Sequence, residues 1–380
     1  MKFFAGGVII LINRMRYADG RKEGLYMDKK RVCVIFGGES PEHDISQKSV
    51  TSILNKLDRN KYDISAVGIT KKGEWYLYEG DYSKIESGEW EKDENIKKAV
   101  ISPDGSDRAL LVLDGGKAEK RPVDVIFPVL HGEYGEDGTI QGLFELSHIP
   151  YVGMGVPASA NGMDKALSKI VFANAGIPQA DWVVVKNIDD IEKKADEIEN
   201  KLGYPCFIKP ARTGSSVGVG KAHTRDELKA ALDNAFKFDA KVLVEECIDG
   251  HEVECAVLGN DNPKASTVGE IIPTVEFYDF DAKYNDNSTM LQIPAKLPEK
   301  TIEEIRGYAV KAFTALEGQG LSRVDFFVKN DSGEVVLNEI NTLPGFTNIS
   351  MYPKLWEAVG TEYSKLLDKL IELAETRVKR

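Results

Sequence analysis

The sequence predicts an α/β protein with a doubly wound N-terminal domain and two further domains of the α+β class. The segment "RVCVIFGG" is a continuous strand-forming run that ends in two glycines, which is typical of parallel strands covered on both faces. The helix predicted after it has one apolar face, formed by Ile45, Val50, Ile53, Leu54 and Leu57. Beyond residue 150, strands and helices no longer alternate strictly, which indicates α+β domains.

Residues 28–150 are expected to form the doubly wound domain. A second strand is predicted in "YDISAVGIT" and a third in "VDVIFPVLHG", which precedes the helix "DGTIQGLFELSHI". The segment "KKGEWYLYEG" between them is expected to add a hairpin as a decoration. Ligands of such sheets bind at the carboxyl ends of the strands, so the loops after the first and third strands are candidate sites.

The remaining chain is expected to form two domains, because a single core rarely grows beyond ~250–300 residues. Residues 151–241 are predicted to be a central domain that begins with one helix, "NGMDKALSKIVFANAG". Residues 242–380 are predicted to be a C-terminal domain with alternating strands and a terminal helix.

Composition and charge exclude several classes of protein. The net charge of -12 argues against a nucleic-acid partner, because binding to nucleic acid needs clustered Lys and Arg. The longest candidate membrane segment, Phe3 to Ile12, is far shorter than the ~20 residues of a spanning helix. The four cysteines form no Cys-x-x-Cys pair, which fits a reducing cytoplasm.

Residues 1–27 are expected to be a disordered extension. A signal peptide is the alternative, but no small-residue cleavage site follows the apolar stretch. Met27 begins "MDKKRVCVIFGG", which resembles a natural start.

Charged residues interrupt an apolar hairpin in "SRVDFFVKNDSGEVVLNEINTLPG". Side chains alternate along a strand, so Arg323 and Asp325 are predicted on one face, and Glu339 and Asn341 project together on the partner strand. Oxygen donors without His or Cys favour Mg²⁺ or Mn²⁺ over zinc. The alternative is a buried ion-pair cluster centred on Arg323.

A phosphate-binding loop is predicted in "FIKPARTGSSVGVGK". Lys209 ends a strand, and the backbone N–H groups of residues 214–218 could surround a polyphosphate. The segment is not a Walker A loop, and a plain hairpin turn explains it equally well. Lys165, on the preceding helix, is either a phosphate ligand or a solvated surface lysine.

Further acidic residues lie at predicted strand ends. Glu245, Glu246 and Glu252 could hydrogen-bond a nucleotide base or ribose, although edge-strand solubility is the alternative for each. In the first domain, Glu42 begins a helix, and His131 and Glu136 follow a strand. Glu42 is a candidate for binding a cationic ligand group, and the alternative for these residues is a helix cap with loop hydrogen bonds.

The segment "VEFYDFDAKYNDNSTMLQIPA" has no clear period. Long irregular segments within compact domains are usually lids or linkers. Its aromatic content favours a lid, which is placed at residues 276–292.

Together these motifs resemble those of the D-alanine:D-alanine ligase family of the ATP-grasp superfamily. "HGEYGEDGTIQG" and "GLSRVDFFVKNDSGEVVLNEINTLPG" are similar to the two signatures of that family, and "GGESPEHDIS", "MDK", "IKPARTGSSVG" and "FYDFDAKY" occur in the family order. The resemblance extends from about Lys30 to the C-terminus and implies an ATP-grasp fold of three domains. It also implies ATP and D-alanine as substrates, two Mg²⁺ or Mn²⁺ ions and a homodimer.

The resemblance further implies roles for individual residues. ATP contacts are implied for Lys165, Lys209, Ser216, Glu245, Glu246, Ile248, Glu252 and Lys283. Metal contacts are implied for Asp325, Glu339 and Asn341, and D-alanine contacts for Glu42, His131, Ser350 and Met351. Ser215 and Tyr284 would secure the lid, and Arg323 with the N–H of Gly345 would stabilise an oxyanion.

The implied reaction phosphorylates one D-alanine and then couples the acylphosphate to a second. Ligases that form D-alanyl-D-serine or D-alanyl-D-lactate share most of these residues, and the "AKY" of the predicted lid favours the dipeptide reaction. A nucleotide-binding module without catalysis is a further alternative, but it would predict damage at the metal ligands, which are intact. Glu246 stands where some relatives have a lysine.

Overall fold

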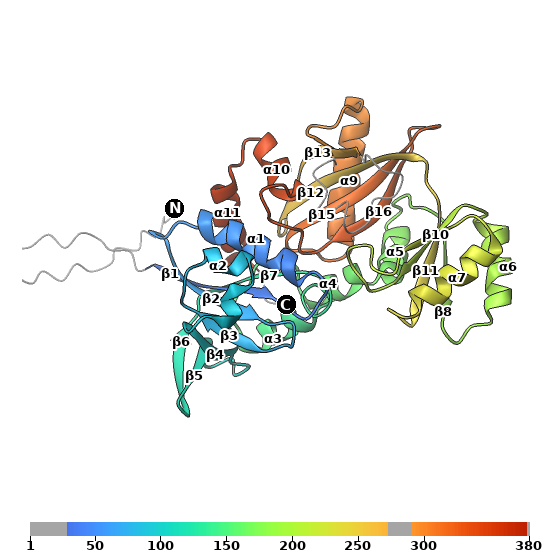
Figure 1. Ribbon diagram of the computed structural model, residues 1–380. Coiled ribbons are helices and arrows are strands. Elements are labelled where there is room, and N and C mark those ends of the chain that lie inside the picture. Colours follow the sequence, from blue (N-terminus) through green and yellow to red (C-terminus); the bar gives the residue numbers. More distant parts are fainter. Residues whose placement is uncertain (1–28, 273–289, 378–380) are drawn as a thin grey trace, which may run out of the picture.

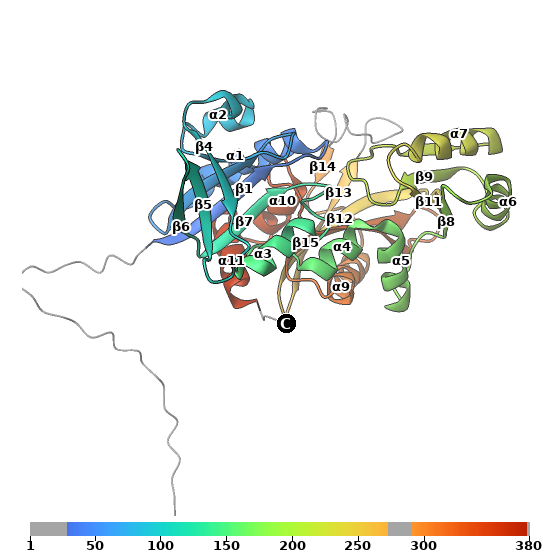
Figure 2. The same ribbon diagram turned by 90° about the horizontal axis from the view of Figure 1, so that it is seen from below.

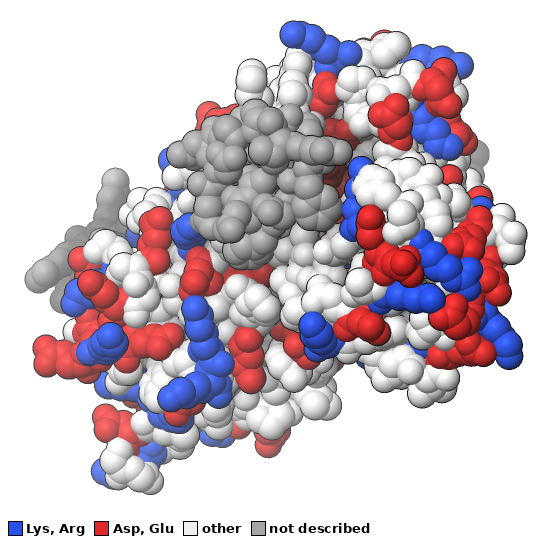
Figure 3. All heavy atoms as spheres, turned by 45° about the vertical axis from the view of Figure 1, so that its right-hand side comes forward, with Lys and Arg blue, Asp and Glu red and all other residues white. Residues whose placement is uncertain are grey.

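A computed structural model describes residues 29–272 and 290–377. Within those residues the chain forms three sheets, and Figure 1 shows the N-terminal domain in blue and the central domain in green and yellow on different sides of the orange and red C-terminal domain. Every helix among the described residues falls short of the length and apolar character that a membrane-spanning helix requires. Lys and Arg are interspersed with Asp and Glu on the face drawn in Figure 3.

The N-terminal sheet has seven strands in the order β6-β5-β4-β3-β2-β1-β7. Its strands are β1 (Lys30–Gly37), β2 (Tyr62–Ile69), β3 (Trp75–Tyr78), β4 (Ile96–Ile101), β5 (Ala109–Asp114), β6 (Lys117–Pro122) and β7 (Val125–Leu130). Its helices are α1 (His43–Lys56), α2 (Ser83–Glu86), the 3-10 helix η1 (Glu89–Lys92) and α3 (Thr139–Ser147). Strand β1 is parallel to both β2 and β7, as predicted for a doubly wound core.

This sheet combines parallel and antiparallel strand pairs, which corrects the prediction of a purely doubly wound arrangement for strands β3 to β6. The segment predicted as a hairpin decoration supplies β3, an internal strand that pairs antiparallel with β2 and β4. Strands β4, β5 and β6 continue the antiparallel series and were not predicted. Strand β6 reads "KAEKRP" and is almost wholly exposed, so it carries no apolar alternation that a sequence pattern could reveal.

The central domain contains a four-stranded sheet in the order β10-β9-β11-β8. Its elements are α4 (Val156–Met163), α5 (Lys165–Asn174), β8 (Trp182–Lys186), α6 (Ile191–Lys201), β9 (Cys206–Pro210), β10 (Gly220–Ala222), α7 (Arg225–Ala235) and β11 (Lys241–Glu246). The first helix was predicted as one piece but divides at Asp164, whose carboxylate accepts hydrogen bonds from the N–H groups of Ala166 and Leu167. This N-cap begins a new helix, so Lys165 is the first residue of α5.

The C-terminal domain contains a five-stranded antiparallel sheet in the order β14-β13-β12-β15-β16. Its elements are β12 (Gly250–Gly259), β13 (Lys264–Ile272), β14 (Met290–Gln292), α9 (Glu299–Ala315), β15 (Gly320–Lys329), β16 (Val335–Asn341), α10 (Met351–Ala358) and α11 (Tyr363–Thr376). One face packs on α9, while α10 and α11 cover part of the other.

A single hydrophobic cluster joins the N-terminal sheet to α10 and α11. Phe127 of β7 meets Phe346 edge-on, with ring centroids 6.4 Å apart. Helix α11 lies beside β7 (Figure 2), and this shared core sets the N-terminal loops beside the C-terminal sheet. The predicted N-terminal and C-terminal domains are therefore packed on each other through buried apolar surface.

Candidate functional site

A cavity of about 840 Å³ lies where residues of all three sheets and their loops converge. Most of the residues singled out in the sequence line it: Glu42, His131, Glu136, Lys165, Lys209, Ser215, Ser216, Glu245, Glu246, Ile248, Glu252, Arg323, Glu339, Asn341 and Gly345. A concave site with several convergent charged groups is the usual setting for ligand binding.

The acidic hairpin has the geometry that the sequence predicts. Strands β15 and β16 pair antiparallel, with Arg323 opposite Asn341 and Asp325 opposite Glu339. Directly opposed residues point to the same face of a sheet. The amide Nδ2 of Asn341 donates to Asp325 Oδ2 over 2.8 Å, so the four side chains form one polar surface.

The alternative of an ion-pair cluster centred on Arg323 is also present. The guanidinium of Arg323 lies 2.9 Å from Glu254 Oε2 and donates two hydrogen bonds to Asp325. All three side chains are buried, where an ion pair must be well hydrogen-bonded to be tolerated. Glu254 was missed in the sequence, although it lies two residues after Glu252 and therefore on the same face of β12.

The residues of the hairpin fit a hard divalent cation by their chemistry. Asp325, Glu339 and Asn341 offer carboxylate and amide oxygens, the donors that Mg²⁺ and Mn²⁺ prefer. The described residues contain no group of three or more His, Cys, Asp or Glu arranged to hold a metal. A cation here would therefore need the amide oxygen of Asn341 and oxygens of a bound ligand in addition to the two carboxylates.

Lys165 and Lys209 line the cavity beside the hairpin. Lys209 Nζ lies 2.6 Å from Glu245 Oε2 and donates to Asn338 Oδ1 over 3.2 Å. Lys165 Nζ donates to the carbonyl oxygen of Thr213 over 2.8 Å and lies 3.9 Å from Glu339 Oε2. Lys165 is thus part of the cavity wall, and the alternative of a solvated surface lysine is wrong.

Glu245 is a buried carboxylate with a lysine on each oxygen. Lys169 Nζ lies 2.6 Å from Oε1, opposite Lys209 on Oε2. Burial alone would raise the pKa of Glu245, but the charges of Lys209 and Lys169 outweigh it and lower the pKa to about 2. The same carboxylate raises the pKa of Lys209 against the opposing effect of burial. Glu245 and Lys209 are therefore both charged at neutral pH.

Lys169 was not singled out in the sequence. The available signal was its spacing from Lys165, because residues four apart lie on the same face of a helix. Both lysines of α5 consequently point toward the central cavity or its wall.

The glycine-rich loop connects β9 to β10 and approaches the N-terminal domain. Ser215 and Ser216 have φ angles of 48° and 59°, a left-handed conformation that is costly for residues other than glycine. A Cβ at Gly214 would lie 2.7 Å from Glu42 Oε2, so only glycine allows this approach. The hydroxyl of Ser215 donates a hydrogen bond to Glu42 Oε1.

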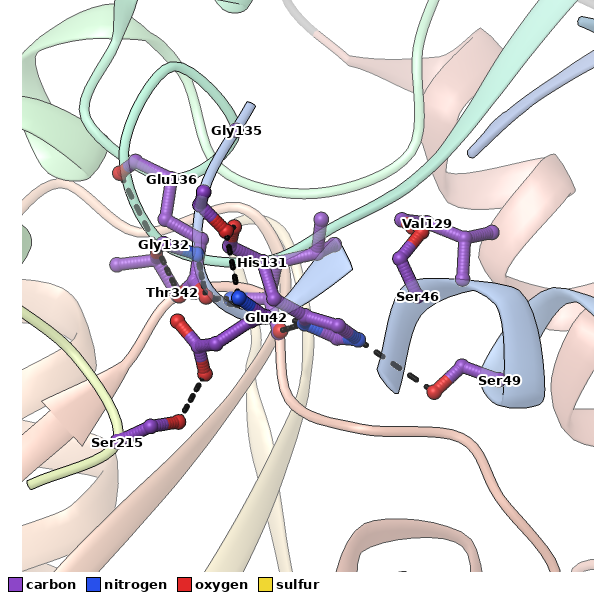
Figure 4. Close-up of polar contacts among 12 residues, drawn as sticks. Glu42, Ser46, Ser49, Val129, His131, Gly132, Gly135, Glu136, Ser215 and Thr342 are labelled. Atoms are coloured by element: carbon purple, nitrogen blue, oxygen red, sulfur yellow. Dashed lines mark hydrogen bonds and ion pairs between the residues drawn. The ribbon is translucent and has the colours of Figure 1, made fainter. Parts of the chain in front are cut away.

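Figure 4 shows how Glu42, His131 and Glu136 lie beside this loop. Glu42 precedes α1, but its side chain makes no capping hydrogen bond, so the alternative of a helix cap is wrong for this residue. The carboxylate points instead to Ser215 of the glycine-rich loop.

His131 and Glu136 connect the N-terminal domain to the loop after β16. His131 Nδ1 lies 3.1 Å from the carbonyl oxygen of Leu343, and Glu136 accepts a hydrogen bond from the Leu343 N–H over 3.3 Å. Glu136 also accepts from the N–H of Gly132 over 3.0 Å. These contacts are the loop hydrogen bonds of the alternative interpretation, and they hold the segment that leads to Gly345.

Other predicted residues lie apart from the cavity lining. Ser350 is the N-cap residue of α10, and its hydroxyl accepts a hydrogen bond from the N–H of Thr347 over 2.9 Å. Met351 is buried in the core that α10 shares with the sheet. Lys283 and Tyr284 lie outside the described residues. The described strands on either side of them, β13 and β14, pair with each other, and Ile272 lines the cavity.

Comparisons with known proteins agree with this architecture. The model of the D-ala D-ala ligase N-terminus matches residues 31–154, and that of the D-ala D-ala ligase C-terminus matches residues 171–372. A D-alanine--D-alanine ligase of Acetivibrio thermocellus is 56% identical, with 92% of this chain and 97% of the relative covered. A D-alanine--D-alanine ligase of Thermoanaerobacter sp. is 54% identical, with the same coverage of 92% and 97%.

Solved structures show the same relationship. The VanG D-Ala:D-Ser ligase from Enterococcus faecalis has a TM-score of 0.84 at 42% identity and covers 91% of this chain and 99% of its own. The D-alanine-D-alanine ligase from Coxiella burnetii has a TM-score of 0.81 at 38% identity and covers 91% of this chain and 94% of its own. The fold is therefore the predicted ATP-grasp fold, and this chain belongs to the D-alanine:D-alanine ligase family.

Proposed function

We propose that this chain uses ATP to join two D-alanine molecules into D-alanyl-D-alanine for peptidoglycan precursor synthesis. The observation that carries the proposal is the meeting of three sets of groups in one cavity: the lysines, the acidic hairpin and Glu42. The two relatives named above, 56% and 54% identical, are D-alanine--D-alanine ligases.

ATP is placed between the central and C-terminal sheets. Lys165 and Lys209 contact its phosphates, aided by the N–H groups around Ser216, because ammonium groups and turn amides both attract phosphate. The nucleoside end lies toward the chain that joins β11 to β12. Its contacts come from Glu245, Glu246, Ile248 and Glu252, all of which line the cavity.

Asp325, Glu339 and Asn341 hold Mg²⁺ or Mn²⁺, which when bound neutralises charge on the phosphates. The same hairpin keeps Arg323 in a fixed orientation through its contacts with Asp325 and Glu254. A positioned guanidinium can stabilise negative charge that develops during the reaction without moving at that moment.

The first D-alanine lies next to Glu42, whose carboxylate pairs with its ammonium group, and His131 lies on the same side of the cavity. Ser350 and Met351 follow the Gly345 segment and are assigned to the carboxylate of the second D-alanine. Because neither residue lines the described cavity, this assignment rests on the family resemblance.

The reaction then has two steps. A carboxylate oxygen of the first D-alanine bonds to the γ-phosphorus, the bond to ADP breaks, and an acylphosphate forms. The amine of the second D-alanine, having lost a proton, attacks the acyl carbon. Arg323 and the Gly345 N–H stabilise the resulting oxyanion, and inorganic phosphate leaves as the peptide bond forms.

A second candidate is the formation of D-alanyl-D-serine. It is favoured by the likeness to the VanG D-Ala:D-Ser ligase, whose TM-score is 0.84. The higher identity of 56% belongs to a D-alanine--D-alanine ligase, and D-alanine is therefore the preferred second substrate. The proposal also includes that the protein forms a homodimer and acts in the cytoplasm.

Phosphate release tests the substrate class. The purified protein is expected to release phosphate from ATP when D-alanine is present, and not when L-alanine replaces it. The reason is that Glu42 and the oxyanion donors are arranged to bind the D-enantiomer of the amino acid. Protein without an amino acid serves as the control for ATP hydrolysis alone. Equal release with both enantiomers would refute the assignment.

A further inference from the structure

Lys169 is a buried lysine to which the proposed reaction gives no role. Its side chain is only 2% exposed, and its Nζ lies 2.6 Å from Glu245 Oε1. The ammonium group also donates to the carbonyl oxygen of Ala180 over 3.3 Å and lies 5.1 Å from the centre of the Trp182 ring. Burying a lysine is costly, so this set of contacts needs a physical reason.

Lys169 and Lys209 contact the same carboxylate from opposite sides but differ in their access to the cavity. The side chain of Lys209 is 18% exposed and lines the cavity, whereas that of Lys169 is 2% exposed and is not among the described residues that line it. A ligand in the cavity can therefore reach Lys209 directly, while Lys169 stays behind Glu245.

The charge balance of these three groups constrains how Lys209 can act. Two ammonium groups and one carboxylate leave these three groups with a net charge of one positive unit. Without Lys169, a movement of Lys209 toward a phosphate would leave Glu245 as a buried charge with no ionic partner. Such a charge is strongly unfavourable. With Lys169 on the other oxygen, Glu245 keeps an ionic partner throughout.

We infer that Lys169 is a positioning residue that retains Glu245 when Lys209 turns from this carboxylate to the phosphates of the nucleotide. The inference rests on the proposed function, because it assumes that ATP occupies the cavity. It assigns to Lys169 an effect on phosphate binding that operates through Glu245 and Lys209, without contact to the ligand.

The test replaces Lys169 with methionine, which keeps the length of the side chain and removes its charge. Lys209 then becomes the sole lysine on Glu245 and is held there, so the Kd of ADP in the presence of Mg²⁺ is expected to rise about tenfold, which corresponds to about 1.4 kcal/mol. The Kd of adenosine, which has no phosphate, is expected to change much less. Both values are measured by titration calorimetry, and the KM for ATP is expected to rise more than kcat falls.

Three further variants separate this role from simple packing. Lys169→Arg restores the charge and is expected to recover most of the ADP affinity. Lys201→Met is the matched control, because Lys201 also lies near the Trp182 ring, at 5.6 Å, but is itself exposed. Lys169→Gln, which removes the charge but keeps a hydrogen-bond donor, replaces the methionine variant if that protein does not fold.

A double-mutant cycle with Glu245→Gln tests the route through Glu245. Without the carboxylate, Lys209 is not held, so adding Lys169→Met to Glu245→Gln is expected to change the Kd of ADP less than twofold, within the usual error of such cycles. An undiminished second loss would show that Lys169 acts by another route and would overturn the inference.

The remaining outcomes are distinct. An unchanged Kd of ADP in Lys169→Met, or an equal loss for ADP and adenosine, overturns the positioning role while the proposed function stands. If the wild-type protein binds no ADP and releases no phosphate with D-alanine, the proposed function itself is refuted.

Discussion

The guanidinium of Arg323 donates two parallel hydrogen bonds to the carboxylate of Asp325, over 2.8 and 2.7 Å. The two residues are neighbours on the same face of β15 because they are two positions apart. Asp325 consequently orients the proposed oxyanion donor and belongs to the proposed metal site. One carboxylate thus contacts the proposed oxyanion donor and also belongs to the proposed metal site.

Asp325→Asn is expected to lower kcat at least about 100-fold, because it removes charge from the metal site and from the partner of Arg323. The amide has nearly the same shape, so circular dichroism should report an intact fold. The measurement is kcat as a function of Mg²⁺ concentration. Asp331→Asn, in the exposed turn of the same hairpin, is the control, and full turnover in Asp325→Asn would contradict the role.

His131 Nδ1 lies 3.8 Å from Glu136 Oε1, and this contact is expected to make stability depend on pH. Burial alone would lower the pKa of His131. The opposite effect of Glu136 and the other neighbours is larger, so the pKa lies above the usual 6.5. A group whose pKa is higher in the folded protein stabilises the fold below its unfolded pKa, and this stabilisation is lost as the pH rises through the folded pKa.

Glu136→Gln removes the largest of the charges that raise this pKa. The difference in the free energy of unfolding between wild type and variant should be largest below pH 6.5 and smaller in alkaline buffer. Urea unfolding at a series of pH values measures it. A constant difference would mean that only the hydrogen bonds of Glu136 matter.

Gly162 of α4 packs closely against the strand end that leads to the site. A Cβ at this position would lie 2.6 Å from Cγ2 of Thr342, so Gly162→Ala is expected to destabilise the protein by about 1–3 kcal/mol. In α3, Gly142 has nothing within 4 Å of its Cβ position. Gly142→Ala should therefore raise stability by up to about 1 kcal/mol, and the reverse order of the two variants in thermal unfolding would contradict this packing.

The sequence was most informative where a pattern has a short period. Alternation along residues 322–341 placed Arg323, Asp325, Glu339 and Asn341 on one face, and the strand register confirms it. The buried runs of β1 and β7 were identifiable for the same reason, because continuous apolar strands are typical of parallel sheets.

Features that depend on distant contacts were not accessible in this way. The bond of Ser215 to Glu42 joins residues 173 positions apart, and no local pattern reports such a pairing. The break at Asp164 was missed, although Asn161, Gly162 and Asp164 are weak helix formers, because only one residue separates α4 from α5. Strand β6 was missed because edge strands can be polar on both faces.

The central claim is tested most directly by the product formed when D-alanine, D-serine and D-lactate compete in one mixture with ATP and Mg²⁺. Mass spectrometry distinguishes the three possible products. The account predicts that D-alanyl-D-alanine forms in large excess, and that Asp325→Asn forms none of the three at a comparable rate. A predominance of D-alanyl-D-serine or D-alanyl-D-lactate, or no condensed product at all, would contradict it.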